Sequence, residues 1–475
     1  MNPFDELGLF WLPGQEENAL SGRLQFDPTR EGISLRLVGS FDSRSSDHDN
    51  ETQRIIGWRG NDRVTLDQCL PPSTIPRAPG IGESVYHANR MFVGHHFEEE
   101  ELAFQSASMQ LSDLDSWVGR SGIAEEYPEY PGTDSADQPL YRIGYKRLED
   151  QIWAFSRGQL KLAFDWKSNG DPVRELSLKQ WPILSIEYDK IESLDIILKD
   201  LGRLQDLLTL CIDAPTIIDR LVLRRPDIKV KLQSGSDTAI EQPVDFVARQ
   251  TRYISPQERE PRHWHQMLLS FDELGGLKAA ARWLDASQRF QRALDSFISI
   301  KHAEHMFGEN RFLNVTFAAE AFHRITAGGL YMEREAFESL LATYLEHTPK
   351  EHEQWFLGRM KYANELSLRK RLQQLAERAG EASRPLIGAK GRWVDTIVRV
   401  RNELTHLAGD SRAFSGSDLI FLTESVYAIV RLCMLMESGV SQETLIQKAT
   451  ASNMTWYRGR LMETIEKVRM QIDIG

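Results

Sequence analysis

The sequence predicts two domains of different fold class, a β-rich N-terminal region followed by an all-α helical bundle. In residues 1–270, short runs alternate apolar and polar side chains and are separated by Gly, Pro, Asp and Ser, a pattern typical of a sandwich, a jelly-roll-like sheet or an α+β module. In residues 271–475, apolar residues instead recur at steps of three and four, which is the period of α-helices. The chain of 475 residues is long enough for both parts to bury a core.

Within residues 1–270, the alternating runs predict strands throughout. These runs are Gly22–Phe26, Gly32–Gly39, Arg63–Leu66, Met91–Gly94, Ala103–Leu111, Gln159–Asp165, Pro182–Tyr188, Ile228–Leu232 and Pro243–Ala248. One segment, Ser193–Asp213, has the length and period of a helix, which favours an α+β arrangement for this part. Two segments predict loops: the polar stretch Ser40–Thr52, and the Tyr-, Pro- and Asp-rich stretch at 125–140, which is also a candidate sub-boundary.

The helical period continues through the C-terminal region. It predicts helices over Leu277–Lys301, Phe312–Thr326, Glu333–Glu346, Glu351–Ala379, Gly391–Leu407, Asp418–Ser438 and Gln442–Ile472. Helices of this length and number form a bundle of typical domain size. We therefore expect an N-terminal domain over residues 1–270 and an all-α domain over residues 271–475.

Composition places the chain among ordinary globular proteins and excludes several classes. The apolar content is 41% and the charged content 27%. No apolar run reaches the roughly 18 residues that a membrane span needs, and the N-terminus lacks the basic start of a signal peptide. Cys69, Cys211 and Cys433 are widely spaced and odd in number, so they indicate neither a disulfide framework nor a cysteine zinc site. We therefore expect a cytoplasmic protein with no membrane partner.

Charge is distributed unevenly along the chain. The net charge is −12, which argues against nucleic-acid binding by the whole surface. Residues 361–401, however, contain ten basic and four acidic side chains. Such a basic zone suits a confined, phosphate-bearing ligand, although a solvated helix face would explain it as well.

The segment Trp393–Gly409 carries the most informative pattern. Its apolar side chains recur at helical spacing and form one stripe: Trp393, Ile397, Val400, Leu404 and Leu407. A neighbouring polar stripe leads into the pattern Arg401-Asn402-x-x-x-His406, close to the point where Gly409 would end the helix. One helix would thus bury a hydrophobic edge and present a guanidinium, an amide and an imidazole near its C-terminus.

This motif, on a core helix of an α-helical bundle, resembles that of the HEPN superfamily of ribonucleases. More narrowly, Glu309–Arg324 resembles the HEPN domain of ApeA-type bacterial anti-phage proteins. Near the start of the chain, Gly8–Pro13, Gly22–Pro28 and Val64–Leu66 resemble the N-terminal domain of the same proteins. The sequence is thus similar to an ApeA-type defence protein over most of its length, whereas residues 120–270 match only by position.

What the resemblance implies is a metal-independent endoribonuclease that uses no cofactor. Arg401 would neutralise charge on the scissile phosphate. His406 would be the general base or acid for attack by the ribose 2′-hydroxyl. Asn402, four residues before His406, would orient the imidazole ring or hold a phosphate oxygen. The expected product carries a 2′,3′-cyclic phosphate.

The resemblance also implies supporting roles for residues around the motif. Glu320, within the resembling segment, would steady Arg401, although a structural ion pair explains this residue equally well. Arg399, which precedes the motif, and Thr405, which lies within it, would support it. The residues expected to contact RNA lie in the basic zone: Arg392 and Lys390.

The resemblance also implies partners. HEPN proteins are typically dimers, and two motifs brought together would supply the second acid–base group that one histidine lacks, so we expect a homodimer or a higher homo-oligomer through the helical domain. The substrate would be transfer RNA or messenger RNA, with structured RNA favoured because the site lies on a helical surface and not on an aromatic sheet. The N-terminal domain would sense infection, with a phage-derived trigger, or restrain the nuclease.

No metal site is expected. His302 and His305 have a spacing that suits two metal ligands on a helix, but no third ligand is placed, so solvated or packed histidines are the preferred interpretation. The sequence contains no P-loop, no dinucleotide-binding fingerprint and no nucleophile-elbow motif. Nucleotide hydrolysis, dinucleotide redox chemistry and serine-hydrolase chemistry therefore receive no support.

Three alternatives to a nuclease stay open. Residues five apart lie about 140° apart around an ideal helix, so His406 could merely interact with the helix C-terminus while Arg401 pairs with a carboxylate. The helical domain could also bind a nucleotide or RNA without cutting it. Finally, the chain could be a pure assembly or sensor protein, whose effect on cell growth would survive loss of the histidine.

Overall fold

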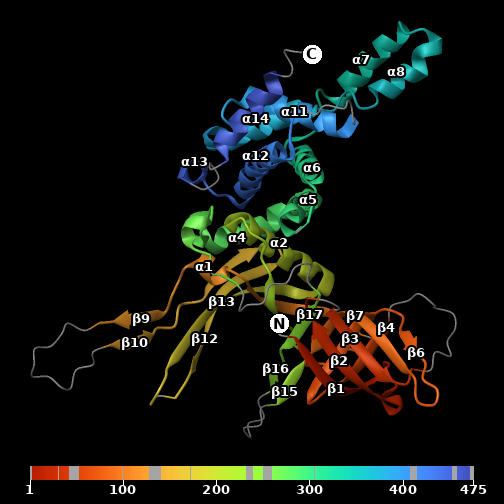
Figure 1. The fold of residues 1–475 in the computed structure, drawn as a ribbon, viewed down its shortest axis with the longest axis vertical. Coiled ribbons are helices and arrows are strands. Elements are labelled where there is room, and N and C mark those ends of the chain that lie inside the picture. Colours follow the sequence, from red (N-terminus) through yellow and green to blue (C-terminus); the bar gives the residue numbers. More distant parts are fainter. Residues whose placement is uncertain are drawn as a thin grey trace, which may run out of the picture. The chain divides into compact units, whose positions relative to one another are not determined.

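The structure, a computed structural model, divides into two compact units (Figure 1). The N-terminal unit comprises Met1–Leu208 and Thr216–Arg262, and the helical unit comprises Thr209–Pro215 and His263–Gly475. The sequence predicted a division between residues 270 and 271, with a candidate sub-boundary near 125–140. The residues described are 3–29, 32–41, 53–98, 100–127, 141–171, 173–231, 239–249, 259–260, 262–303, 305–406, 414–451 and 457–470, without the side chains of Lys231, Trp264 and His406.

The N-terminal unit is built mainly from β-strands. Its strands are β1 (Phe4–Trp11), β2 (Leu20–Asp27), β3 (Gly32–Val38), β4 (Gln53–Arg59), β5 (Asp62–Cys69), β6 (Ser73–Ile75), β7 (Glu83–Val93), β8 (Ala103–Leu111), β9 (Ile123–Glu126), β10 (Arg142–Tyr145), β11 (Gln151–Phe155), β12 (Gly158–Asn169), β13 (Ser177–Ser193), β14 (Ile218–Arg224), β15 (Lys229–Lys231), β16 (Ala239–Glu241) and β17 (Val244–Ala248). Two helices accompany them, α1 (Leu114–Val118) and α2 (Leu194–Ile212). Most of the strands belong to one antiparallel sheet, whose order is β11-β12-β13-β8-β14-β17-β7-β3-β2-β1-β4-β5.

Part of this sheet closes into a barrel, because β5 at its end also pairs with β7. The barrel strands appear in red and orange in Figure 1. Phe10, from the Gly-Leu-Phe-Trp segment at the start of the chain, is fully buried in the barrel core. Gly22 and Gly57 make room for its ring, since a Cβ at Gly57 would lie 2.4 Å from Phe10 Cδ1 and one at Gly22 3.1 Å from Phe10 Cδ2. Larger residues at these two positions would therefore displace the ring.

The predicted class, a β-rich region followed by a helical region, is confirmed. The arrangement of the strands is a barrel with a sheet extension, whereas the sequence suggested a sandwich or jelly-roll-like sheet. Closure depends on the pairing of β5 with β7, which joins residues such as Val64 and Val93, and local alternation of side chains cannot show such a pairing. Residues 42–52 and 128–140, on which most of the two predicted loops and the sub-boundary fall, lie outside the described residues.

Helix α2 follows β13 directly and is attached to the sheet by a buried charged cluster. Asp200 is fully buried, accepts a hydrogen bond from Tyr188 Oη at 3.0 Å and forms ion pairs with Arg157 and Arg203. Burial raises the pKa of Asp200, and the two guanidinium groups oppose this effect. The cluster fixes α2 against β13 and against the turn between β11 and β12.

The helical unit contains the C-terminal helices. They are α3 (Phe271–Leu274), α4 (Gly276–Ser287), α5 (Gln291–His302), α6 (Gly308–Ala327), α7 (Arg334–Glu346), α8 (Glu353–Met360), α9 (Leu368–Ala379), α10 (Arg384–Ile387), α11 (Lys390–His406), α12 (Gly416–Leu435), α13 (Gln442–Ala451) and α14 (Arg458–Met470). Three helices that the sequence predicted as continuous are divided. Leu277–Lys301 is broken by a 3-10 turn at Gln288–Phe290, Glu351–Ala379 is interrupted between α8 and α9, and Gln442–Ile472 becomes α13 and α14.

Helix α12 is the central element of the helical unit and contacts α6, α9 and α14. Among the described residues, one segment, Gly416–Ser438, is long and apolar enough to cross a membrane, but 78% of its most apolar window is buried inside the fold. Ser415 and Asp418 form a capping box at its start, which satisfies free backbone N–H groups there. This pattern of burial is that of a core helix.

Arg431 on α12 holds the last turn of α2, which belongs to the helical unit. Its side chain is almost fully buried and donates to the carbonyl oxygens of Leu210, at 2.6 Å, and Cys211, at 3.3 Å. The same guanidinium lies 3.4 Å from Asp213, which Lys301 approaches on its other oxygen at 3.0 Å. A cation at a helix C-terminus satisfies carbonyl groups that have no partner within the helix.

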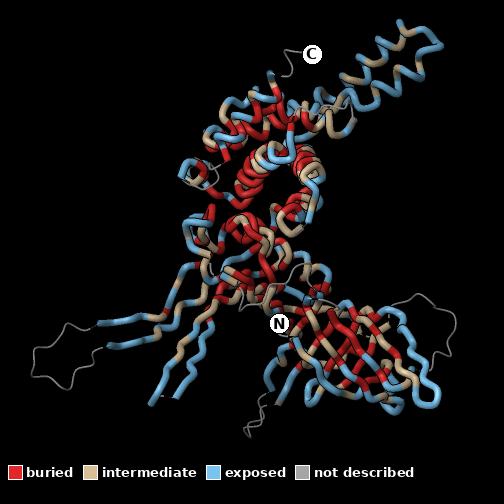
Figure 2. The backbone as a smooth tube through the Cα atoms, viewed as in Figure 1, coloured by how far each residue is buried: buried red, intermediate tan, exposed pale blue. Residues whose placement is uncertain are grey.

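Helices α7 and α8 form an arm that has no buried residue, as Figure 2 shows. The base of the arm is closed by backbone hydrogen bonds from Tyr331 N to Asn364 O, at 2.7 Å, and from Leu366 N to Gly329 O, at 2.8 Å. Large apolar side chains nevertheless lie exposed along it: Leu330, Tyr331, Leu340, Tyr344, Trp355, Leu357 and Tyr362. Large exposed apolar side chains of this kind are typical of surfaces that bind partners when they form a contiguous patch.

Candidate functional site

Helix α11 positions the motif residues as its periodicity predicts. Trp393, Ile397 and Val400 are fully buried, and Trp393 Nε1 donates to Ser425 Oγ on α12 at 2.8 Å. The apolar stripe therefore anchors the helix to the core, and a polar indole N–H finds a partner there. Arg401 and Asn402 lie in the last two turns of the same helix, away from that stripe.

Arg401 lies beside Glu320 of α6 and the neighbouring Asn402. Its Nη2 is 4.0 Å from Glu320 Oε2, and its Nη1 donates to Asn402 Oδ1 at 3.4 Å. The Arg401 side chain is 31% exposed and that of Glu320 23% exposed. Both contacts are long for charge-assisted hydrogen bonds, which are typically about 2.7–2.9 Å, so the described residues orient the guanidinium without saturating it.

The other cations of α11 have much closer partners. Arg399 donates to Glu403 at 2.9 Å and to Val468 O at 3.3 Å, so it links α11 to α14. The two residues predicted to contact RNA are also paired: Arg392 lies 2.9 Å from Glu466 and Lys390 lies 2.6 Å from Glu377. Both of these pairs are largely exposed, and exposed ion pairs contribute little, about 0–1 kcal/mol, so they can exchange partners.

Thr405 and His406 occupy the end of α11. The Thr405 hydroxyl donates to the carbonyl oxygens of Arg401, at 3.0 Å, and Asn402, at 3.2 Å, which is the common bond of a helical threonine to the preceding turn. His406 is the last residue of the helix. Its side chain lies outside the described part of the chain, as does Gly409 in the segment 407–413.

Behind Glu320 lies a buried polar network that the sequence did not indicate. Arg371 is 1% exposed and donates from Nε to Leu366 O at 2.9 Å. Its Nη1 is 3.4 Å from His323 Nδ1, and His323 Nε2 is 2.7 Å from Gln374 Oε1. Since a guanidinium only donates, this arrangement favours a neutral His323 whose Nδ1 accepts from Arg371 and whose Nε2–H donates to Gln374 Oε1.

Burial lowers the pKa of His323 and of Arg371. The charge of Glu320, together with that of Glu365, opposes this effect on Arg371. Glu320 therefore acts on two guanidinium groups, the buried one of Arg371 and the accessible one of Arg401. The only sequence signals for Arg371 were its place in the basic zone and an apolar helical face, neither of which predicts a buried arginine.

Among the residues that the structure describes, no three His, Cys, Asp or Glu side chains gather closely enough to hold a metal ion. His305 lies outside α5, which ends at His302, so the two histidines do not share a helix as their spacing suggested. Glu304, between them, lies outside the described residues.

Comparison with known families matches both parts of the chain. ApeA N-terminal domain 1 matches residues 5–283, which is more than half of the chain, and the Apea-like HEPN domain matches residues 313–444, which include Glu320 and the whole Arg401–His406 motif. Neither the curated proteins nor the solved structures contain a significant match. HEPN domains are generally ribonucleases, and they commonly bind RNA and dimerise. The chain therefore belongs to the ApeA family of anti-phage proteins and carries a C-terminal HEPN domain.

Proposed function

We propose that this protein is a metal-independent endoribonuclease that cleaves RNA at the Arg401–His406 motif during phage infection. The proposal rests on the distances between the Arg401 guanidinium and its neighbouring carboxylates. Among the described residues, the carboxylate nearest to Arg401 lies at 4.0 Å, whereas Arg392 and Arg399, the other arginines of α11, have carboxylates at 2.9 Å. A preorganised guanidinium that is still able to accept a phosphate is what phosphoryl-transfer chemistry requires.

In the proposed reaction, the ribose 2′-oxygen attacks the adjacent phosphorus and the bond from phosphorus to the 5′-oxygen breaks. His406 takes the proton of the 2′-hydroxyl, and a second acid returns a proton to the leaving 5′-oxygen. Arg401 neutralises the charge that develops on the phosphate oxygens, and Asn402 orients either the imidazole or a phosphate oxygen. Glu320 and Thr405 support this arrangement from α6 and from the helix end, and Arg399 supports it by tying α11 to α14.

Two acid–base groups are needed, and one motif supplies one histidine. We propose that a homodimer brings two motifs together, each protomer supplying one of the two groups. The exposed arm of α7 and α8 favours such an assembly, because helices without a buried residue gain stability only when another surface covers them. Trp355 and Tyr344 are large aromatic side chains of the kind that dominate binding at interfaces.

Replacing Trp355 by alanine is expected to weaken the dimer. The side chain is 64% exposed in the single chain, so its loss costs the monomer little, whereas an aromatic anchor at an interface is worth about 2–4 kcal/mol. The dissociation constant should rise by roughly 30- to 1,000-fold, which analytical ultracentrifugation over a range of protein concentrations would measure. Ile420→Ala, which removes an exposed apolar side chain on α12, is the matched control. A wild-type chain that stays monomeric at tens of micromolar would rule the assembly out.

The substrate in this proposal is transfer RNA or messenger RNA in the cytoplasm. Structured RNA is favoured because the motif lies on a helical surface, which offers no platform for stacking single-stranded bases. Lys390 and Arg392 would exchange their exposed carboxylate partners for phosphates of the bound RNA. The N-terminal unit would sense a phage-derived trigger or restrain the nuclease until that trigger appears.

Incubation of the purified protein with labelled total RNA in excess EDTA tests the proposal. We expect cleavage that EDTA does not reduce, and new ends that carry a 2′,3′-cyclic phosphate, because no step of the proposed reaction uses a metal ion. Ligation by an enzyme that accepts only cyclic phosphate ends, followed by sequencing, identifies both the chemistry and the RNA. RNA that is bound but remains intact with the trigger present would favour the non-catalytic alternative.

A further inference from the structure

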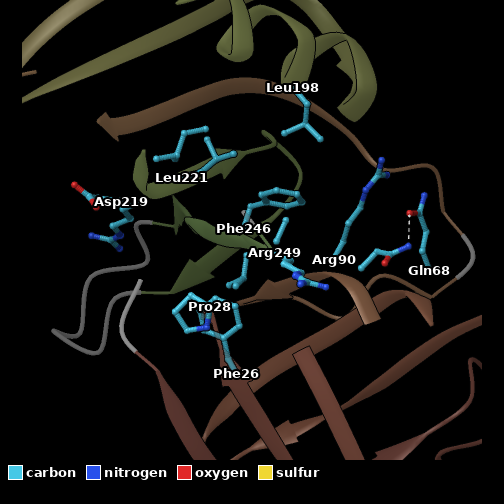
Figure 3. A pocket seen from close by; sticks show the side chains of 14 residues that line it. Phe26, Pro28, Gln68, Arg90, Leu198, Asp219, Leu221, Phe246 and Arg249 are labelled. Carbon is cyan, nitrogen blue, oxygen red and sulfur yellow. Dashed lines mark hydrogen bonds between the residues drawn. The ribbon is translucent and has the colours of Figure 1, made fainter. Parts of the chain in front are cut away.

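A cavity of about 340 Å³ lies within the N-terminal unit, beside the barrel (Figure 3). Its walls come from segments far apart in the sequence: β2 and the residue following it, β5, β7, α2, β14 and β17. This volume falls at the small end of the range of ligand pockets, about 300–1,000 Å³. The cavity therefore has room for one small molecule.

The middle of the cavity is apolar. Figure 3 shows Phe246 of β17 between Leu198 and Leu221 on one side and Phe26 and Pro28 on the other. Phe92 holds Phe246 from the core, with ring centroids 5.3 Å apart in an edge arrangement. An aromatic side chain fixed in this way offers a rigid surface for a flat ring.

One end of the cavity is polar and positively charged. Arg90 and Arg249 lie there together with the amides of Gln68 and Asn89, which are joined by a hydrogen bond of 3.5 Å (Figure 3). Arg90 is held by Asp195 at 3.1 Å. The guanidinium of Arg249, by contrast, has no hydrogen bond or ion pair with any residue that the structure describes, and its aliphatic part lies over Gly32, within 3.4 Å of the position of a Cβ there.

The other charged groups of the lining are neutralised. Arg220 forms a paired contact with Asp245, at 2.8 and 3.3 Å, and Asp219 is paired with Arg259 at 2.8 Å. Within the described part of the chain, the lining thus presents one uncompensated positive charge, that of Arg249. A ligand that is flat and apolar at one end and carries a compact anion at the other matches this distribution.

Gln68 is held in this end of the cavity by an unfavourable backbone conformation. Its φ is 55°, in the left-handed region that side chains larger than glycine rarely adopt, and the pairing of β4 with β5 shifts register nearby. Backbone strain at a bulge is typical of positions where a side chain must be aimed at a ligand. The amides of Gln68 and Asn89 can both donate and accept, which suits the edge of a heterocycle.

We propose that this cavity binds a nucleoside monophosphate, with the base against Phe246, the phosphate on Arg249 and the edge of the base or the ribose on Gln68 and Asn89. Each part of the ligand matches one feature of the cavity. The base fits the apolar wall, the phosphate pairs with the guanidinium of Arg249, and the edge of the base or the ribose bonds to the two amides. The site lies within the N-terminal unit and involves none of the residues of the Arg401–His406 motif. The proposed nucleotide would therefore bind the N-terminal unit whether or not the helical unit cleaves RNA.

Isothermal titration of the full-length protein with AMP, GMP, CMP and UMP tests the proposal, with inorganic phosphate and the free nucleosides as separate titrants. At least one nucleotide should bind at millimolar concentration or tighter, and more tightly than phosphate or the matching nucleoside. Arg401→Ala should bind it as the wild type does, which separates this site from the ribonuclease site. Binding that disappears in Arg401→Ala, or no binding of any nucleotide, would overturn the proposal.

Substitution of Arg249 identifies the phosphate contact. Arg249→Ala should weaken binding by at least about tenfold, because a charge-assisted hydrogen bond is lost, whereas Arg249→Lys should recover part of the affinity. Arg249 is exposed, so both variants should unfold at the temperature of the wild type. Arg174→Ala removes an exposed arginine of the same unit that does not line the cavity and serves as the control. Equal affinity in all of these variants would show that the nucleotide binds elsewhere.

Discussion

Replacing Arg401 by alanine is expected to reduce RNA cleavage by roughly 100- to 1,000-fold while leaving the fold intact. The guanidinium would no longer be present to neutralise the charge that develops on the phosphate. Its contacts in the structure are long, 4.0 Å to Glu320 and 3.4 Å to Asn402, and its side chain is partly exposed, so its removal leaves no buried charge without a partner. Single-turnover cleavage of a labelled RNA, measured with the thermal unfolding temperature, would separate the two effects.

The matched control is Arg384→Ala. Arg384 lies in the same basic zone, is strongly exposed and has its carboxylate partner, Glu381, at 3.9 Å, so this variant loses an equal charge at a position away from the motif. It should cleave RNA as the wild type does. His406→Ala should be as inactive as Arg401→Ala, since the proposed reaction needs both groups. If either motif variant cleaves RNA and arrests cells like the wild type, the proposed site is wrong.

Arg431→Met is expected to destabilise the helical unit by about 3 kcal/mol or more. The substitution keeps the apolar volume of the side chain but removes the donor to Leu210 O and one of the donors to Cys211 O, which keeps the backbone N–H of Leu268. It also removes a cation from beside Asp213, which Lys301 approaches as well. Buried polar groups that lose a partner account for the largest effects of single substitutions. Urea unfolding monitored by tryptophan fluorescence would report the loss as a lower midpoint.

Arg392→Ala is the control for this measurement. Arg392 also loses an ion pair, with Glu466 at 2.9 Å, but both side chains are about half exposed, so the expected loss is below about 1 kcal/mol. A midpoint for Arg431→Met that equals that of Arg392→Ala would mean that the buried contacts to α2 contribute no more than a surface pair. The last turn of α2 would then not be a structural part of the helical unit.

The sequence predicts well those features that local spacing determines. The predicted apolar stripe of α11 comprised Trp393, Ile397, Val400, Leu404 and Leu407. The first three are fully buried and Leu404 is half-buried, because a period of 3.6 residues reports directly which side of a helix is apolar, and Leu407 lies outside the described residues. The alternating runs predicted strands such as β8, Ala103–Leu111, with its bounds. The candidate site on α11 was named from the same local pattern and from its resemblance to the HEPN domain.

Features that join distant segments could not be predicted in this way. The barrel closes through β5 and β7. The division of Glu351–Ala379 depends on backbone hydrogen bonds that join residues 329–331 to residues 364–366 at the base of the arm. The buried arginines could not be predicted for the same reason. Arg371 and Arg431 look like surface residues in the sequence, because their partners come from other helices: His323 from α6, and the end of α2. The cavity of the N-terminal unit is likewise lined by six separate segments.

The contact of Arg431 with the end of α2 has a consequence for the order in which the chain assembles. Leu210 and Arg431 are 221 residues apart. At a synthesis rate of about 5–20 residues per second, the ribosome adds Arg431 roughly 10–45 s after Leu210. The helical unit therefore completes its core only after the N-terminal unit and helices α3 to α11 have been translated, so a product terminated before Arg431 contains the N-terminal unit without a finished HEPN bundle. In a protein proposed to cut the RNA of its own cell, the N-terminal unit is thus synthesised before the helical unit that would carry the nuclease site.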